Sequence, residues 1–210
     1  EPVVMSPAHF GADTFLAATA RFEHPVRFVS LVPTQLGRLL ESDAAIDALR
    51  GFSRILVGGQ SMPSDLANAA GAAGLNVTRT YGSSETSGGC VYDGVPIGTT
   101  EVTIVDDRIE IAGSVLAEGY LDDPRRSAFA FRVRDGKTWY RTDDLGAVHH
   151  GALAVTGRVD DVIVSGGIKV SLSEVESVVR DLPGLAAAVV VSAPHAEWGE
   201  VPVVVVTEPP

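Results

Sequence analysis

Three short segments of the sequence combine glycine, hydroxyl and charged side chains in patterns that could do chemistry. The first, residues 80–89 (TYGSSETSGG), places small residues around one carboxylate, Glu85. Glycine lets a ligand approach the backbone, hydroxyls donate hydrogen bonds to phosphate oxygens, and one glutamate can ligate a hard cation such as Mg²⁺. The segment lacks the lysine of a G-x-x-x-x-G-K-[ST] phosphate loop. By composition alone it is either such a binding segment or an ordinary surface loop.

The other two segments combine acids with basic side chains. Residues 139–146 (WYRTDDLG) present Asp143 and Asp144 just before a Leu-Gly step. The pair is either a strand-to-turn junction or a place where one carboxylate accepts both hydroxyls of a ribose. Residues 157–169 (GRVDDVIVSGGIK) begin with Arg158 and end at Lys169. Each segment has a structural explanation on its own, but no such explanation covers all three in this order.

The elements that must position these segments change in type along the chain. The first ninety or so residues alternate strand and helix patterns, which predicts crossover units on a largely parallel sheet. From Gly94 to Gly157 short strands alternate with turns, for example 102–105 and 108–111 around Asp106-Asp107, which predicts an antiparallel module.

The last part of the chain, from Val159, predicts a small α+β unit. Strands at 162–164 and 168–170 flank Gly166-Gly167 as in a hairpin. Ser171 and Glu174 then form the S-x-x-E pattern of a helix N-terminus. The apolar residues that follow at helical spacing predict a buried stripe; they are Val175, Val178, Val179 and Leu182.

Composition limits the classes of function. The 210 residues are 45% hydrophobic, enough for a core, and carry a formal net charge of −11, which argues against a nucleic-acid binder. Apolar runs are too short for a membrane span. One cysteine, Cys90, excludes an intramolecular disulfide and fits a reducing cytoplasm, and we interpret it as a small buried residue. Five histidines without metal-ligand spacing give no zinc site.

Taken together, the three segments resemble the motifs of the adenylate-forming superfamily, which comprises acyl-CoA synthetases, nonribosomal-peptide adenylation domains and luciferases. The matching residues are 81–86 (aromatic-Gly-x-x-Glu-Thr), 141–146 (Arg-Thr-x-Asp-Leu-Gly) and 157–176 (Gly-Arg-x-x-Asp…Glu-Val-Glu). Residues 55–61 resemble the family's Gly-Gly loop, and 119–124 its Gly-Tyr…Pro segment. The resemblance spans essentially the whole chain.

The resemblance implies a role for individual residues. Tyr81 would stack on adenine, Glu85 would ligate Mg²⁺, and Thr86 would contact the α-phosphate. Asp144, rather than Asp143, would bind the ribose hydroxyls. The other implied residues are Gly59, Thr80, Gly82 and Ser83 around the nucleotide, Arg158 at the ribose, Asp160 as a hinge, and Lys169 near phosphate or CoA. The acid pocket would lie at Gly58, Gln60, Ser84, Gly88 and Gly89.

The implied fold is an α/β enzyme body followed by an incomplete, hinged α+β domain. We expect an α/β subdomain at residues 1–94, a β-rich subdomain at 95–159 and part of a C-terminal lid at 160–210. Two parts of the family's pattern are absent: no segment before Ile55 resembles its phosphate loop, and no Gly-Lys segment with its catalytic lysine follows the last predicted strand. The sequence thus resembles the central and later part of such an enzyme.

The implied activity is ATP-dependent ligation of a carboxylic acid to CoA through an acyl-adenylate, with ATP, Mg²⁺ and CoA as cofactors. The run from Arg79 to Gly94 most resembles o-succinylbenzoate–CoA ligases of menaquinone biosynthesis from high-GC bacteria. Two alternatives stay open: a CoA ligase for another small acid, and a non-catalytic fragment that binds nucleotide or packs against a partner. We expect a cytoplasmic protein, a homodimer as one oligomeric option, no nucleic-acid or membrane partner, and no adenylation by this chain alone.

Overall fold

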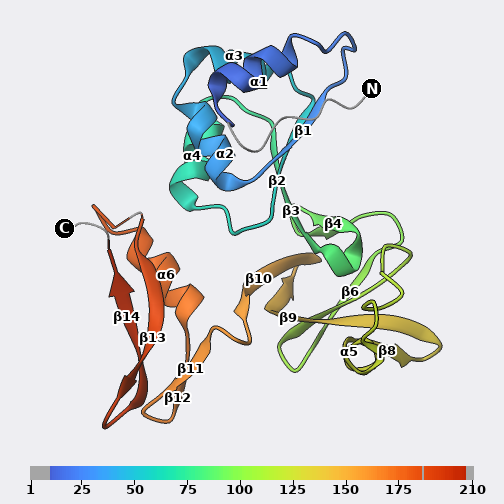
Figure 1. Cartoon of the computed structure of the whole chain (residues 1–210), viewed down its shortest axis with the longest axis vertical. Helices are drawn as coiled ribbons and strands as arrows, with labels where there is room; N and C mark the ends of the chain where they lie inside the picture. Colours follow the sequence, from blue (N-terminus) through green and yellow to red (C-terminus); the bar gives the residue numbers. More distant parts are fainter. Residues whose placement is uncertain (1–9, 186, 207–210) are drawn as a thin grey trace. The chain divides into compact units, whose positions relative to one another are not determined.

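The computed structural model describes residues 10–185 and 187–206, which form two compact units (Figure 1). The first unit runs to Ser83 and includes residues 88–93, and the second comprises residues 84–87 and the chain from Gly94 onward. Residues 1–9, 186 and 207–210, which belong to the first and third predicted domains, lie outside the described residues. Within the described part of the chain, no helix is long and apolar enough to cross a membrane.

The first unit combines helices with a sheet whose first three strands are parallel. Its elements are α1 (Ala12–Thr19), β1 (Phe28–Leu31), α2 (Pro33–Leu40), α3 (Asp43–Arg50), β2 (Arg54–Val57), α4 (Ser64–Ala72), β3 (Val77–Ser83) and β4 (Gly88–Tyr92). The strands pair in the order β1-β2-β3-β4, with Val29 opposite Ile55 and Ile55 opposite Val77 in parallel register. The predicted parallel crossover units are confirmed, and β4 adds an antiparallel strand.

A hydrophobic core holds these strands in place. Leu36 and Leu39 of α2 and Leu49 of α3 are fully buried because each lies on the apolar face of its helix. Ser42 caps α3 by accepting a hydrogen bond from the backbone N–H of Ala45. The remaining buried members of this core are Phe15, Val29, Leu31, Ala45, Phe52, Ile55, Val57, Ala70 and Leu75. The core therefore fixes β2 and β3, whose carboxyl ends carry the predicted site residues.

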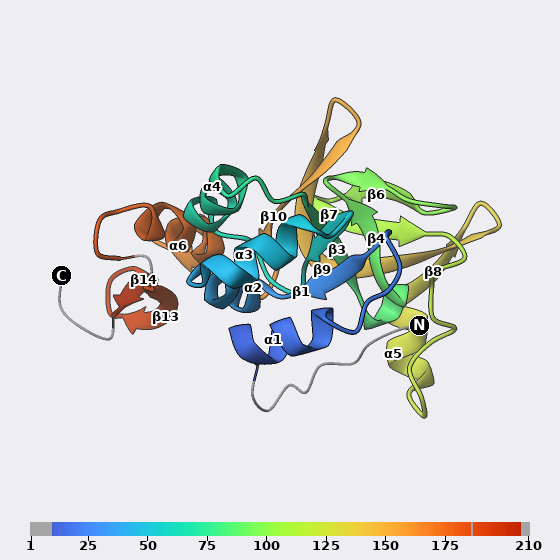
Figure 2. The same cartoon turned by 90° about the horizontal axis from the view of Figure 1, so that it is seen from above.

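The second unit begins with an antiparallel sheet (Figure 2). Its elements are the short 3₁₀ helix η2 (Ser84–Thr86), β5 (Val95–Pro96), β6 (Glu101–Val105), β7 (Arg108–Ala112), α5 (Pro124–Ala130), β8 (Phe131–Arg134), β9 (Lys137–His149) and β10 (Ala152–Arg158). The strand order is β10-β9-β7-β6, with β8 paired to β9. The predicted β6–β7 hairpin is confirmed, and Asp106 and Asp107 turn it with positive φ angles of 51° and 64°.

The chain from β11 onward forms a separate sheet with one helix. Its elements are β11 (Val162–Ser165), β12 (Ile168–Ser171), α6 (Leu172–Arg180), β13 (Val189–His195) and β14 (Gly199–Val205). The strand order is β12-β11-β14-β13. The β11–β12 hairpin is confirmed, and Ser171 accepts a hydrogen bond from the Glu174 N–H at 3.2 Å, which confirms the predicted cap.

The predicted buried stripe of α6 is wrong: Val175 and Val179 are only half-buried, and the other two positions are exposed. Val178 is 67% exposed and Leu182, just beyond the helix, is 50% exposed. The helix instead docks through a polar row: Glu176 accepts a hydrogen bond from the Val190 N–H at 2.9 Å, and Arg180 donates to the Ala188 carbonyl at 2.8 Å.

Candidate functional site

The predicted glycine-rich segment is a β-hairpin rather than a loop. Tyr81 and Gly82 belong to β3, with Tyr81 opposite Val91 and Gly82 opposite Gly89 in β4. A side chain at Gly82 would overlap the carbonyl oxygen of Gly88, so glycine is required there for the two strands to approach. The hairpin presents Gly88 and Gly89 on exposed backbone.

The Gly-Gly turn after β2 meets β3 in the first unit. A Cβ at Gly58 would overlap the hydroxyl of Thr80, and the Thr80 hydroxyl lies 3.5 Å from the Val57 carbonyl. Gly59 has a φ of 82° and, like Gln60, is exposed. Because β2 and β3 are parallel, these residues share the carboxyl edge of the sheet, where α/β proteins bind ligands. Gly58, Gly59, Gln60 and Thr80, all in the first unit, therefore lie at one edge of the sheet.

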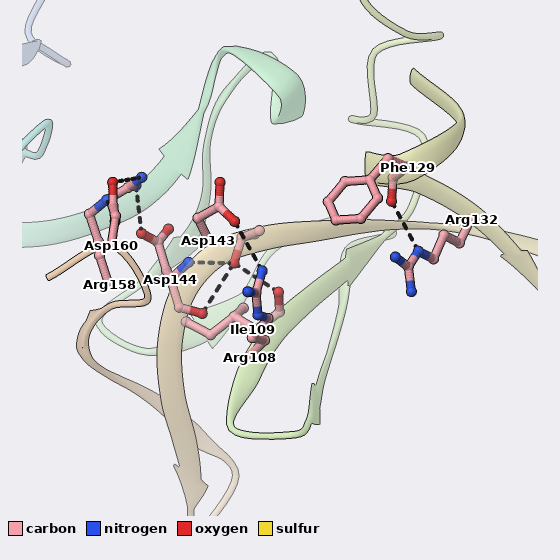
Figure 3. A network of polar contacts seen from close by, with 9 residues as sticks. Arg108, Ile109, Phe129, Arg132, Asp143, Asp144, Arg158 and Asp160 are labelled. Atoms are coloured by element: carbon pink, nitrogen blue, oxygen red, sulfur yellow. Dashed lines mark hydrogen bonds and ion pairs between the residues drawn. The ribbon is translucent and has the colours of Figure 1, made fainter. Parts of the chain in front are cut away.

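Asp144 and Arg158 form a cross-strand pair at the end of the β9–β10 ladder (Figure 3). Their Cα positions are directly opposite, and Arg158 Nη1 lies 3.1 Å from Asp144 Oδ1. Arg158 also donates two hydrogen bonds to Asp160, from Nε at 2.9 Å and from Nη2 at 3.2 Å. One guanidinium thus joins the predicted ribose acid to the predicted hinge residue.

The pairing of Arg158 with Asp160, called here the Arg158–Asp160 fork, shifts the pKa values of both residues. The hydrogen bonds from Arg158 are the largest cause that lowers the pKa of Asp160, and burial only partly opposes it. The same contact with Asp160 raises the pKa of Arg158 beyond its already high value, with the charges of Asp144 and Asp143 adding to it. The guanidinium therefore stays charged, and Asp160 stays ionised well below neutral pH.

Thr142 fixes the backbone of Asp144 from inside the sheet. Its side chain is buried, donates a hydrogen bond to the Ile109 carbonyl at 2.8 Å and accepts one from the Asp144 N–H at 3.1 Å. Asp143, one residue earlier, pairs instead with Arg108 at 3.0 Å (Figure 3). Successive strand residues face opposite sides, so one acid is directed to Arg158 and the other to Arg108.

Glu85 is the carboxylate of η2, and its partner is Tyr120. The Tyr120 hydroxyl donates to Glu85 Oε1 at 2.8 Å. Burial first, and then the hydrogen bond and negative charge of Glu85, raise the pKa of Tyr120, while a hydrogen bond from Tyr140 and the charge of Arg126 oppose the shift. Tyr120 belongs to the Gly-Tyr…Pro segment, for which the sequence predicts no role. The residue is 35 positions from Glu85 in the sequence, so no local pattern reveals the contact.

The remaining predicted residues occupy varied environments. Thr86 is buried, with 1% of its surface exposed. Ser84 is exposed, and Lys169 is exposed on β12 opposite Val164. Cys90 is buried in β4, as predicted.

The donor set around Glu85 fits a cation held mainly by a substrate. Among the described residues, no group of three or more histidine, cysteine, aspartate or glutamate side chains could form a protein cage for a metal ion. Mg²⁺ usually keeps waters and binds one or two carboxylates together with substrate phosphates. One partly buried glutamate beside a glycine-rich hairpin has that character.

Sequence and structure comparisons identify related proteins. The chain is 42% identical over 163 residues to a protein named "Probable 2-succinylbenzoate–CoA ligase" from Mycobacterium tuberculosis, a match that covers 76% of this chain and 41% of that protein. The 2-succinylbenzoate–CoA ligase of Salmonella typhimurium is 34% identical over 185 residues, covering 84% of this chain and 39% of the relative. No protein-family model matches.

A solved structure gives the same relationship. The o-succinylbenzoate CoA synthetase of Bacillus subtilis, determined with the acyl-adenylate intermediate OSB-AMP, matches with a TM-score of 0.78 at 28% identity, covering 93% of this chain and 44% of that one. The chain therefore spans less than half the length of the proteins it resembles, and within that span it has their mixed α/β fold.

Proposed function

We infer that this chain, which has the sequence and fold of a segment of the adenylate-forming superfamily and is similar to the 2-succinylbenzoate–CoA ligases, forms part of an ATP-dependent acid–CoA ligase. The observation that carries the proposal is the Asp144–Arg158 cross-strand pair with Asp160 attached. It joins two motifs of the superfamily at one point of the fold, beside the turn where β10 ends. We assign o-succinylbenzoate as the acid because the relatives named above act on it.

The reaction has two steps that share one adenylate. A carboxylate oxygen of the acid attacks the α-phosphorus of ATP, and the bond to pyrophosphate breaks. The thiol of CoA then attacks the acyl carbonyl, loses its proton, and expels AMP. Both steps depend on positioning the reactants and on neutralising the charge that develops.

Asp144 and Arg158 would hold the ribose. An ionised carboxylate offers about four acceptor positions, so Asp144 can accept ribose hydroxyls while it keeps its ion pair with Arg158. Thr142 keeps the Asp144 backbone in place, which limits the reorganisation that binding requires. Arg158 stays charged throughout and can donate to the nucleotide as well.

Glu85 would hold the cation that accompanies the phosphates. When bound, Mg²⁺ offsets the negative charge of the triphosphate. Thr86 would donate to the α-phosphate, and Tyr81, with Gly59, Thr80, Gly82 and Ser83, would line the nucleotide. The acid would bind at Gly58, Gln60, Ser84, Gly88 and Gly89.

Other assignments remain predictions. Lys169 would approach phosphate or CoA from β12, and Asp160 would act as the hinge between two orientations of the chain that follows it. The cytoplasmic location and the homodimer also stay predictions.

The test is a panel of carboxylic acids assayed with the full reading frame that encodes these residues. ATP–pyrophosphate exchange reports the first step, and thioester formation with CoA reports the second. We expect o-succinylbenzoate to give the highest kcat/KM. Asp144→Asn should reduce exchange, whereas the matched variant Asp143→Asn, one residue earlier in β9, should not.

The other outcomes select the alternatives. A different acid with the highest kcat/KM would identify a ligase for that acid. Nucleotide binding without exchange for any acid would identify a non-catalytic protein. Equal effects of the Asp143 and Asp144 variants would contradict the ribose assignment.

A further inference from the structure

We propose that Tyr120 is a positioning residue that holds the carboxylate of Glu85 in one orientation for the divalent cation. The inference rests on the proposed function for the identity of that cation. The geometry behind it is independent, because the two side chains form a 2.8 Å hydrogen bond within the second unit.

The segment that carries Glu85 is tied to the segment that leads to Tyr120 by several hydrogen bonds. The backbone carbonyl of Glu85 accepts from the Ala117 N–H at 2.8 Å. The Ser87 hydroxyl donates to the Val115 carbonyl at 2.9 Å. Together with the Tyr120–Glu85 bond, these contacts fix both the backbone and the side chain of Glu85.

Tyr120 is itself held on several sides. Its ring packs edge-on against Phe131 with centroids 5.8 Å apart, and the guanidinium of Arg126 lies 3.9 Å from the ring centroid. Its backbone N–H donates to the Ser127 hydroxyl at 2.8 Å. Tyr140, buried in β9, hydrogen-bonds to the Tyr120 phenol. The hydroxyl that reaches Glu85 therefore has little freedom to rotate away.

A phenol suits this role chemically. It is neutral at pH 7, so it restrains the carboxylate without cancelling the charge that attracts a cation, as lysine or arginine would. A glutamate has several freely rotating bonds, and a cation that recruits one unrestrained carboxylate must bear the cost of ordering it. Where few protein carboxylates are available, the partner that orients one of them has a large influence on affinity.

The experiment compares Tyr120→Phe with the unmodified full reading frame. This variant removes the hydroxyl and keeps the ring that packs on Phe131 and Arg126. We expect the affinity of Mn²⁺ for the protein–ATP complex, measured by electron paramagnetic resonance, to fall roughly tenfold. In exchange assays the Mg²⁺ concentration for half-maximal rate should rise, with kcat retained at saturating Mg²⁺. Metal-free AMP binding, measured by calorimetry, should not change.

Two further hydroxyl deletions serve as matched variants. Tyr92→Phe removes a hydroxyl from β4 in the first unit, outside the assigned site, and should leave Mn²⁺ affinity unchanged. Tyr140→Phe removes the hydroxyl that hydrogen-bonds to Tyr120 rather than to Glu85. This variant should weaken Mn²⁺ binding less than Tyr120→Phe does. Metal-free thermal unfolding of each variant separates loss of positioning from loss of structure.

The outcomes distinguish this inference from the proposed function. If Glu85→Gln abolishes Mn²⁺ binding and Tyr120→Phe does not change it, the positioning role is wrong and the metal assignment stands. If Glu85→Gln has no effect, the metal assignment itself is wrong. If Tyr120→Phe lowers AMP affinity and metal-free thermal stability together with Mn²⁺ affinity, Tyr120 is structural and the inference is overturned.

Discussion

Asp143 and Asp144 are chemically identical neighbours, but the strand gives them different partners. Asp143 pairs with Arg108 at 3.0 Å, and Asp144 pairs with Arg158 at 3.1 Å. The Asp144 side chain is 20% exposed and that of Asp143 is 61% exposed. A hydrogen bond to an ionised group is stronger where water competes less. The environment therefore favours Asp144 as the acid that binds a ligand hydroxyl.

Asp144→Asn should weaken ATP binding in the full reading frame. The amide loses the charge that strengthens hydrogen bonds to the ribose, which is worth about 1.5–3 kcal/mol and corresponds to roughly a 10- to 150-fold lower kcat/KM for ATP. Asp143→Asn should stay near the unmodified value. ATP-dependent pyrophosphate exchange measures both. An unchanged KM for ATP in the Asp144 variant would make this acid a structural residue.

The Arg158–Asp160 fork should respond to acid. Because the pKa of Asp160 is lowered in the fold, its stabilising contribution is fully present above the ordinary aspartate pKa of about 4 and is lost as pH falls through the lower folded value. With half-exposed side chains, the contribution should be below about 1 kcal/mol. Carbon-13 NMR of the Asp160 carboxyl should show this low pKa, and Arg158→Gln should raise it. Arg108→Gln should leave it unchanged; an equal rise in both variants would contradict the assignment.

At the scale of elements, short sequence patterns predict hairpins well, because the geometry of a turn depends on only a few residues. Asp106-Asp107 and Gly166-Gly167 adopt positive φ at both positions, which the two-residue turns of twisted hairpins require. The parallel strands were predicted from apolar runs that alternate with helical patterns. The β3–β4 hairpin was not predicted, because its glycines and serines resemble a loop until the strands are seen to pair.

The glycine of β3 gives a test of that hairpin. Gly82→Ala would force a Cβ against the Gly88 carbonyl, so we expect a loss of about 1–3 kcal/mol in the free energy of unfolding and weaker nucleotide binding. Gly71→Ala in α4 is the matched control: no atom lies within 4 Å of its new Cβ, and helix propensity favours alanine by about 0.5–1 kcal/mol. Urea unfolding measures both. Equal effects would mean that β3 and β4 do not approach as closely as described.

Helix α6 shows where periodicity fails. Its apolar row was expected to be buried, but a charged row docks the helix through Glu176 and Arg180. Hydrophobic spacing identifies an apolar face without showing which neighbour covers it. Side chains that bond to a strand edge, as Glu176 does to Val190, can decide the orientation instead.

At the scale of the whole molecule, sequence motifs predicted which residues to consider, and the fold shows how some of them meet. Asp144 was named from one motif and Arg158 and Asp160 from another, and the three side chains are joined by hydrogen bonds. The partnership of Glu85 with Tyr120 could not be predicted, because a loop closure over 35 residues brings them together. Spacing along the chain carries no information about such contacts.

The charge balance of the chain leads to a final prediction, about the 210 residues on their own. The sequence contains two lysines, Lys137 and Lys169, and a formal net charge of −11. Lys137 is held by both oxygens of Glu101 at 2.5 and 2.6 Å, which leaves Lys169 as the lysine available to a triphosphate. Transferring an adenylyl group requires positive groups placed at the phosphates. Arg158 is assigned to the ribose, and no segment before Ile55 resembles the superfamily's phosphate loop. We therefore expect the isolated chain to show no pyrophosphate exchange above background, while the full reading frame is active under the same conditions. Circular dichroism must first establish that the isolated chain is folded. Exchange by that chain at the rate of the full protein would show that these residues suffice for adenylation.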